Sequence, residues 1–206
     1  MPSHGDRKRD AILQAAMDVS SAEGLGGLTI GRLAREIGMS KSGLFAHFGS
    51  KEELQLATVR FAADDYEREV IAPPQAAEPG LSRLRALMSC WVRYIDATSN
   101  RGGCFFDAAS SEFGSRPGPV RELLARYSRN WLHQLEEQAR LAHRLGELRA
   151  DADPELLVFR LHAYVEEANW SRELFQDERA FEKARAAIDE TLGAASAAPP
   201  TEENPR

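Results

Sequence analysis

The chain has 206 residues, of which 43% are hydrophobic, and it carries a formal net charge of −6 at neutral pH. This length allows one small module and one larger domain, or a single compact domain. No apolar run approaches the roughly 18 residues that a membrane-spanning helix needs, and the charged N-terminal residues lack the apolar stretch of a signal peptide. We therefore expect a cytoplasmic protein that does not enter a membrane.

The charge is unevenly distributed along the chain. Residues 1–60 hold eight Lys or Arg and seven Asp or Glu, a net charge of +1, so the remaining chain carries −7. A near-neutral start and an acidic remainder suit a protein that touches nucleic acid at one end only. Arg7, Lys8 and Arg9 would either follow the nucleic acid or form an ordinary solvated start.

Hydrophobic periodicity and proline placement predict helices throughout. All ten prolines lie at a terminus or between segments with helical periodicity, where proline does not interrupt a helix. No segment alternates in the manner of a strand. We predict an all-α fold of about nine helices. The expected helices outside residues 29–50 cover about 7–22, 51–71, 81–98, 104–113, 119–145, 154–175 and 179–192.

Residues 29–48 predict two short helices joined by a sharp turn. The first has one apolar face, with Thr29 placed as its N-cap and Gly38 as its left-handed C-cap. Ser40 can cap the second helix, whose buried side is expected to hold Leu44, Phe45 and Phe48. This is the helix-turn-helix pattern, in which the second helix lies in the major groove of DNA. The first apolar face consists of Ile30, Leu33, Ala34 and Ile37.

A longer helix is expected to begin after Ser50, because Ser50 and Glu53 have the spacing of a capping box, in which each side chain satisfies the other's backbone donor. This helix would join the two parts of the chain. We divide the chain into a helix-turn-helix head (residues 1–50), a helical body (51–193) and a disordered tail (194–206).

A set of residues in the head matches a known family. They are Leu28-Thr29-Ile30, Leu33-Ala34, Ile37-Gly38-Met39-Ser40, Leu44-Phe45, His47-Phe48 and Lys51-Glu52-Glu53-Leu54. On these residues, about a quarter of the chain, the head resembles the TetR/AcrR family of bacterial transcriptional regulators. The resemblance implies a body that binds a ligand and forms a homodimer through the helices at about 154–175 and 179–192.

The resemblance also implies which residues touch DNA. Thr29, at a helix N-terminus, can offer its hydroxyl and its backbone N–H to a phosphate. His47 and Lys51 resemble phosphate contacts of the family, and such contacts position a protein without reading the sequence. The family often has tyrosine at the position of Phe45, so Phe45 lacks a hydroxyl for phosphate and we interpret it as partly structural.

The outward side of the second helix is expected to face the base edges. Lys41 can donate to guanine O6 and N7, and Ser42 can pair with several bases. Gly43 lowers helix propensity by about 1 kcal/mol relative to alanine, and its expected benefit is close approach of the backbone to DNA. The expected base-reading set is Lys41, Ser42, Gly43 and Ala46.

The body is rich in aromatic residues, which favours either a core and dimer interface or an apolar cavity between helices. The candidates for a ligand site are Trp91, Tyr94, Phe105, Phe106, Trp131 and His162. His162 and Glu166 are one helical turn apart, so they would form a hydrogen-bonded pair or, as the alternative, share a metal. Cys90 and Cys104 lack metal or redox spacing and are expected to be reduced, buried thiols; a disulfide is the alternative.

These observations predict a ligand-responsive DNA-binding regulator, a repressor that a small apolar or aromatic effector releases from a palindromic operator in double-stranded DNA. It would be cytoplasmic, associated with the nucleoid when bound to DNA. No catalytic motif, cofactor motif or metal motif is evident, so we expect no enzyme activity. The alternatives are a helical carrier or enzyme with a vestigial head, and a regulator that responds to a protein partner or acts as an activator.

Overall fold

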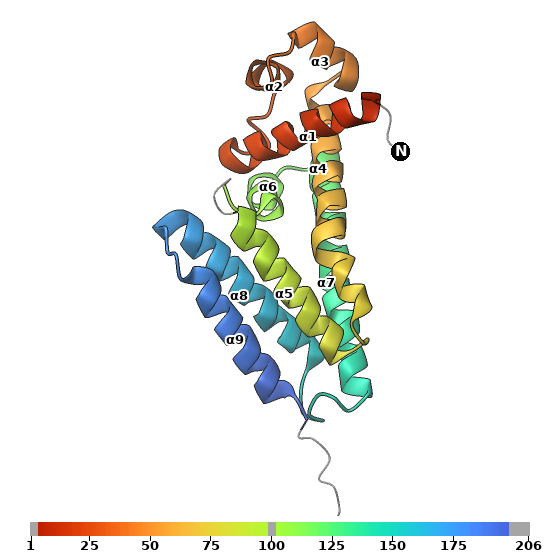
Figure 1. The fold of residues 1–206 in the computed structure, drawn as a ribbon, viewed down its shortest axis with the longest axis vertical. Helices are drawn as coiled ribbons and strands as arrows, with labels where there is room; N and C mark the ends of the chain where they lie inside the picture. Colours follow the sequence, from red (N-terminus) through yellow and green to blue (C-terminus); the bar gives the residue numbers. More distant parts are fainter. Residues whose placement is uncertain (1–3, 99–101, 198–206) are drawn as a thin grey trace, which may run out of the picture.

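The computed structural model describes residues 4–98 and 102–197 and is all-helical, as predicted (Figure 1). The described residues contain nine α-helices and no sheet; Leu148 and Ser196 form an isolated bridge. None of the described helices is both long and apolar enough to cross a membrane. The helices are α1 (His4–Glu23), α2 (Ile30–Glu36), α3 (Lys41–Phe48), α4 (Lys51–Tyr66), α5 (Leu81–Thr98), α6 (Phe105–Phe113), α7 (Pro119–Arg144), α8 (Pro154–Phe175) and α9 (Ala180–Ala195).

The head consists of α1, α2 and α3, which lie across one end of the molecule (Figure 1). Thr29 caps α2 by accepting a hydrogen bond from the Arg32 backbone N–H at 3.1 Å. Gly38 has a φ of +66°, so the turn after α2 uses the left-handed conformation that glycine adopts without strain. The predicted caps therefore fix the directions of α2 and α3.

The helix that joins head and body has an irregular end. α4 continues as a π-helical turn, Glu67–Ile71, in which the Ala72 N–H bonds to the Glu67 carbonyl at 2.8 Å. The predicted end of this helix near Ile71 is confirmed, but the wider final turn was not predicted. Such turns often occur at functional sites, and this one lies beside the cavity described below.

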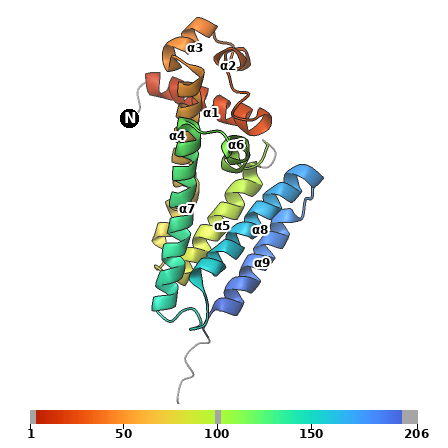
Figure 2. The same ribbon diagram turned by 180° about the vertical axis from the view of Figure 1, so that it is seen from behind.

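In the body, α5, α8 and α9 run side by side, and α7 lies along α4 (Figures 1 and 2). α8 and α9 form the edge of the body that is farthest from α4 in both views. The short helix α6 lies between the head and this bundle and contacts α1.

Two hydrophobic clusters hold the molecule together. One fills the body, and the other fills the head and α4. The head cluster also includes Phe105 and Ala109 of α6 and Val120 and Leu124 of α7. The head is thus packed onto the body through α6 and α7 as well as through α4, and a domain boundary at residue 50 stays a prediction.

The ends of the chain differ from the predictions in two places. α1 begins at His4, so Arg7, Lys8 and Arg9 lie within a helix. α9 ends at Ala195 instead of residue 192, because the Arg149 N–H binds the Ala195 carbonyl at 2.9 Å and holds this end against the preceding loop. Of the predicted disordered tail, residues 198–206 lie outside the described residues.

Candidate nucleic-acid interface and ligand cavity

The second helix of the helix-turn-helix, α3, presents one polar side to solvent. Lys41, Ser42 and Ala46 are exposed, whereas Leu44 and Phe48 are buried on the opposite side. The predicted base-reading side chains therefore lie together on the solvent side of α3.

Gly43 has a local reason to be glycine. The Gly43 N–H donates to the Ser40 hydroxyl at 3.1 Å, which caps α3. A Cβ atom at Gly43 would lie 3.0 Å from that hydroxyl oxygen. A larger residue would therefore require the capping hydroxyl to move by a few tenths of an ångström, in addition to any effect on the distance between backbone and DNA.

Phe45 is more exposed than a structural residue would be. Its side chain is 53% exposed on the solvent side of α3, so our interpretation of Phe45 as partly structural is corrected toward a surface role. Phe48, one turn onward, takes the packing role, with the Arg9 guanidinium 4.9 Å from its ring centre. Arg9 also donates to the His47 carbonyl at 3.3 Å, so it supports α3, while the imidazole of His47 is exposed.

The start of α4 carries the predicted phosphate-binding lysine. Ser50 accepts a hydrogen bond from the Glu53 N–H at 3.0 Å, but its own N–H donates to the Phe48 carbonyl at 2.8 Å. Only half of the predicted capping box is therefore formed, because the tight turn already satisfies the second donor. Lys51 is exposed and its ammonium group donates to the Gly26 carbonyl.

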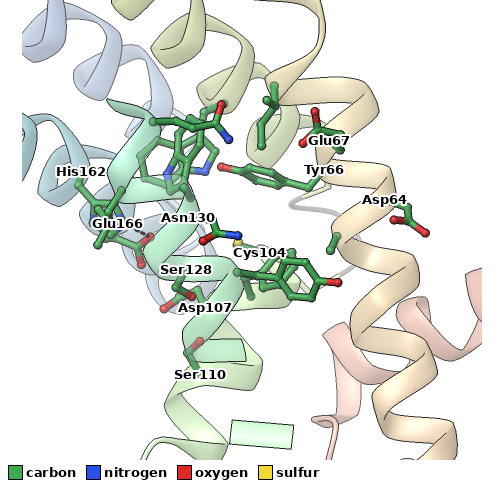
Figure 3. Close-up of a pocket in the computed structure, with 18 residues that line it drawn as sticks. Asp64, Tyr66, Glu67, Cys104, Asp107, Ser110, Ser128, Asn130, His162 and Glu166 are labelled. Carbon is green, nitrogen blue, oxygen red and sulfur yellow. Dashed lines mark ion pairs between the residues drawn. The ribbon is translucent and has the colours of Figure 1, made fainter. Parts of the chain in front are cut away.

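A cavity of about 390 Å³ lies in the body between α4, α5, α6, α7 and α8 (Figure 3). Four of the six predicted ligand residues line it: Trp91, Phe106, Trp131 and His162. Tyr94 and Phe105 do not. The Tyr94 hydroxyl donates to Asp65 at 2.9 Å, and Phe105 belongs to the hydrophobic cluster of the head. Both assignments are therefore corrected.

Tyr66 lies at the centre of the aromatic wall, although it was not among the predicted ligand residues. Its ring centre lies 5.3 Å from that of Trp131 and 5.8 Å from that of Phe106, both in edge-to-face geometry. The rings of Trp91 and Trp131 are 5.2 Å apart. Within the described structure, the buried Nε1 of Trp131 has no hydrogen-bond acceptor. Buried donors are nearly always paired, so this N–H is an exception within the aromatic wall.

The opposite side of the cavity is acidic. Glu166 and Asp107 lie close together there, and Glu166 Oε1 is 3.8 Å from His162 Nε2 (Figure 3). Burial, and then the neighbouring Asp107 carboxylate, raise the pKa of Glu166 to about 8. Burial lowers the pKa of His162, against the opposite effect of Asp107. Near neutral pH, Glu166 thus holds a proton and His162 is uncharged.

The two cysteines are free and buried, as expected. Cys104 lines the cavity. Burial raises the pKa of its thiol to about 12, so the thiolate that acts as nucleophile is scarcely populated near neutral pH. Among the described residues, no group of three His, Cys, Asp or Glu side chains is arranged to hold a metal ion.

Helix α6 connects the cavity to the head. Its first turns contribute Phe106, Asp107 and Ser110 to the cavity wall. Near its other end, the Glu112 carboxylate accepts a hydrogen bond from the Gly26 N–H at 2.8 Å. Gly26 is the residue whose carbonyl binds the Lys51 ammonium group. One short helix therefore touches both the cavity and the loop that holds a predicted DNA contact.

A helix-turn-helix head packed on a helical body with a cavity defines a class of transcriptional regulators in which one polypeptide carries both parts. Comparison with known proteins specifies the family. Residues 12–58 match the family model of bacterial regulatory proteins of the tetR family, and residues 80–188 match the model of the tetracyclin repressor-like C-terminal domain. The chain belongs to the TetR family of transcriptional regulators.

Individual relatives are distant. The chain is 30% identical over 125 residues to the HTH-type transcriptional regulator BetI of Rhizobium meliloti, and the match spans 59% of the length of each protein. The crystal structure of AibR in complex with isovaleryl coenzyme A and operator DNA has a TM-score of 0.70 at 24% identity, covering 90% of this chain and 96% of that one. A regulator from Saccharomonospora viridis in complex with choline has a TM-score of 0.76 at 18% identity, covering 92% and 97%.

Proposed function

We propose that this protein is a homodimeric repressor that binds a palindromic operator through α3 and releases it when a small molecule enters the body cavity. The observation that carries the proposal is the combination of an exposed side of α3 that bears Lys41 and Ser42 with an aromatic cavity in the same chain. The ligand complexes of AibR and of the Saccharomonospora viridis regulator support a ligand in the body, and the operator complex of AibR supports DNA at the head.

On the DNA, we assign separate roles to the residues of the head. Thr29, His47 and Lys51 contact phosphates, and all three are exposed. Lys41 and Ser42 read base edges from the first turn of α3, and the exposed ring of Phe45 can pack on a thymine methyl or a sugar. Gly43 and Ala46 leave space for the groove at the same surface.

The dimer is proposed to form through α8 and α9. α8 exposes large apolar side chains that a monomer would leave in water, and α9 beside it exposes the small residues Ala186, Gly193 and Ala194, which allow close helix packing. Two copies would form a four-helix bundle and place two α3 helices about 34–36 Å apart or at a multiple of that distance. The apolar residues exposed on or next to α8 are Leu156, Phe159, Trp170, Leu174 and Phe175.

Release requires that the ligand binds one arrangement of the heads better than the other. We propose that α6 and α4 transmit ligand binding in the cavity to the head, because both helices line the cavity. Both also contact the Gly26 loop, α6 through Glu112 and α4 through Lys51. Couplings between sites are typically about 1–3 kcal/mol, so a ligand would weaken operator binding roughly 5- to 150-fold.

The test begins with an operator selected from random double-stranded DNA by the full-length protein. Lys41→Ala is expected to weaken operator binding in a gel shift by about 5- to 150-fold per bidentate base contact, with an unchanged circular dichroism spectrum. Arg144→Ala is the matched control, because Arg144 is an exposed cation at the end of α7, outside the head and outside the proposed dimer helices. Operator binding that is equal in wild type and Lys41→Ala would refute the assignment of α3 as the reading helix.

A further inference from the structure

The charge of the cavity wall restricts what the cavity can bind. Four carboxyl groups line the cavity, and its described wall contains no lysine and no arginine. Asp64 of α4 and Glu67 of the π-helical turn after it are exposed, whereas Asp107 and Glu166 are partly buried on the opposite side (Figure 3). A cavity lined by one sign of charge repels ligands of that sign and concentrates ligands of the other sign.

The acidic corner is held in place by its neighbours. The Asn169 side-chain amide donates to Asp107 Oδ2 at 2.7 Å, and the Asn169 side-chain oxygen accepts the Cys104 N–H at 3.1 Å. Asn169 is buried; its bond with Cys104 is buried and its bond with Asp107 is partly buried. Asp107 is therefore oriented before any ligand arrives, which lowers the cost of binding.

The corner also lacks a compensating positive charge. The groups that face Glu166 are Asp107 from α6, His162 from α8, the Cys104 thiol and the Tyr66 phenol. Burial lowers the pKa of His162 and raises the pKa values of Cys104 and Tyr66, so these three groups are neutral near pH 7. A bound cation would supply the missing charge, and Glu166 would then lose its proton.

The rest of the wall suits an apolar body that carries this cation. Trp91, Trp131, Tyr66 and Phe106 surround the space with aromatic rings, which bind both apolar groups and cations.

We infer that the cavity binds an organic cation, in which an amino or quaternary ammonium group lies against Asp107 and Glu166 and an aromatic or aliphatic body lies between the tryptophans. This inference rests on the proposed function of the cavity as the effector site. It excludes carboxylates and phosphorylated compounds, which would bring a negative charge to a wall that already carries carboxyl groups.

The experiment uses three molecules of one shape: 2-(4-methoxyphenyl)ethylamine, 2-(4-methoxyphenyl)ethanol and 3-(4-methoxyphenyl)propanoate. The methoxyphenyl ring of each supplies the aromatic body. By isothermal titration calorimetry of the full-length protein at pH 7, the amine is expected to bind at least ten-fold more tightly than the alcohol, and the propanoate most weakly. In buffers of different ionisation enthalpy, amine binding should release a proton, because the cation favours ionised Glu166.

Glu166→Gln keeps the size of the side chain and removes its charge. It is expected to lower the affinity for the amine about ten-fold, to leave the affinity for the alcohol unchanged, and to abolish the proton release. Glu137→Gln is the matched control, because Glu137 is exposed on α7 and does not line the cavity. If circular dichroism shows that Glu166→Gln is misfolded, Asp107→Asn takes its place. Together with the proton release of the wild type, it then decides whether the amine lies against the carboxyl groups.

Two outcomes would overturn the inference: propanoate binding as tightly as the amine, or no binding of the amine up to 10 mM. Neither outcome affects the proposed repressor function, because operator binding and its loss in Lys41→Ala are measured without any of the three test compounds. Conversely, a protein that binds the amine selectively but binds no operator would support the cation site and refute the proposed repressor function.

Discussion

The head and the body of this protein carry their functional residues in different ways. In the head, the residues assigned to DNA lie within 29–51, and most of them project from one side of α3. In the body, the cavity is assembled from residues between 63 and 166, contributed by α4 through α8 and the turn that follows α4. A surface for DNA can thus be encoded locally, whereas an enclosed cavity depends on the packing of the whole body.

This difference also separates function from stability. The DNA-facing side chains of α3 are exposed, so each can be replaced without opening the core. The cavity wall is shared with the core, and Trp131 is only 7% exposed. Variants of the head should therefore change binding alone, and variants of the body should change binding and folding together.

The largest effect is expected at the edge formed by α8. Phe159 is 70% exposed, and Phe159→Asp would place a charge at the centre of the proposed dimer interface in both copies. We expect the dissociation constant of the dimer to rise at least about 100-fold, as for the removal of a central aromatic anchor. Light scattering should then detect a folded monomer. Operator affinity should fall although the head is unchanged, which would separate the contribution of the body from that of the head.

The control for this variant is Leu145→Asp, which removes an exposed leucine at the end of α7. It should remain a dimer. A dimeric Phe159→Asp variant with normal operator binding would mean that another surface joins the two copies.

The second prediction compares one residue from each region. Trp131→Ala is expected to lower the free energy of unfolding by about 3–5 kcal/mol, because it removes a large buried ring that contacts Tyr66 and Trp91. Lys41→Ala should change the same free energy by no more than about 0.5 kcal/mol. Urea unfolding monitored by circular dichroism measures both. Equal destabilisation by the two variants would contradict the separation of surface and core.

The same contrast explains how much could be predicted from the sequence. The caps Thr29, Ser40 and Gly38 act on residues within one turn, so their spacing predicted α2, α3 and the turn between them. The helical character of the body followed from periodicity. Its two clusters, and the continuation of the head cluster into α6, depend on contacts between distant segments and could not be predicted in the same way.

Phe105 and Phe106 illustrate the limit. They are adjacent and chemically identical, yet Phe105 is in the head cluster and Phe106 lines the cavity. Consecutive residues of an α-helix are about 100° apart, so only the rotation of α6 against its neighbours decides which ring faces the ligand. Likewise, Tyr94 lies one turn from Trp91, but its hydroxyl is taken by Asp65 of α4.

The smallest predicted effect concerns Thr29, which combines a structural role and a proposed phosphate contact. Its hydroxyl oxygen accepts the Arg32 N–H, so Thr29→Ala should lower the free energy of unfolding by about 1 kcal/mol and also weaken operator binding. Thr29→Asp separates the two roles, because aspartate is an equally good N-cap but its charge repels a phosphate. We expect wild-type stability in urea and weakened operator binding in a gel shift. If Thr29→Asp bound the operator as tightly as the wild type, Thr29 would be a cap only, and the phosphate contacts of the head would begin at His47 and Lys51.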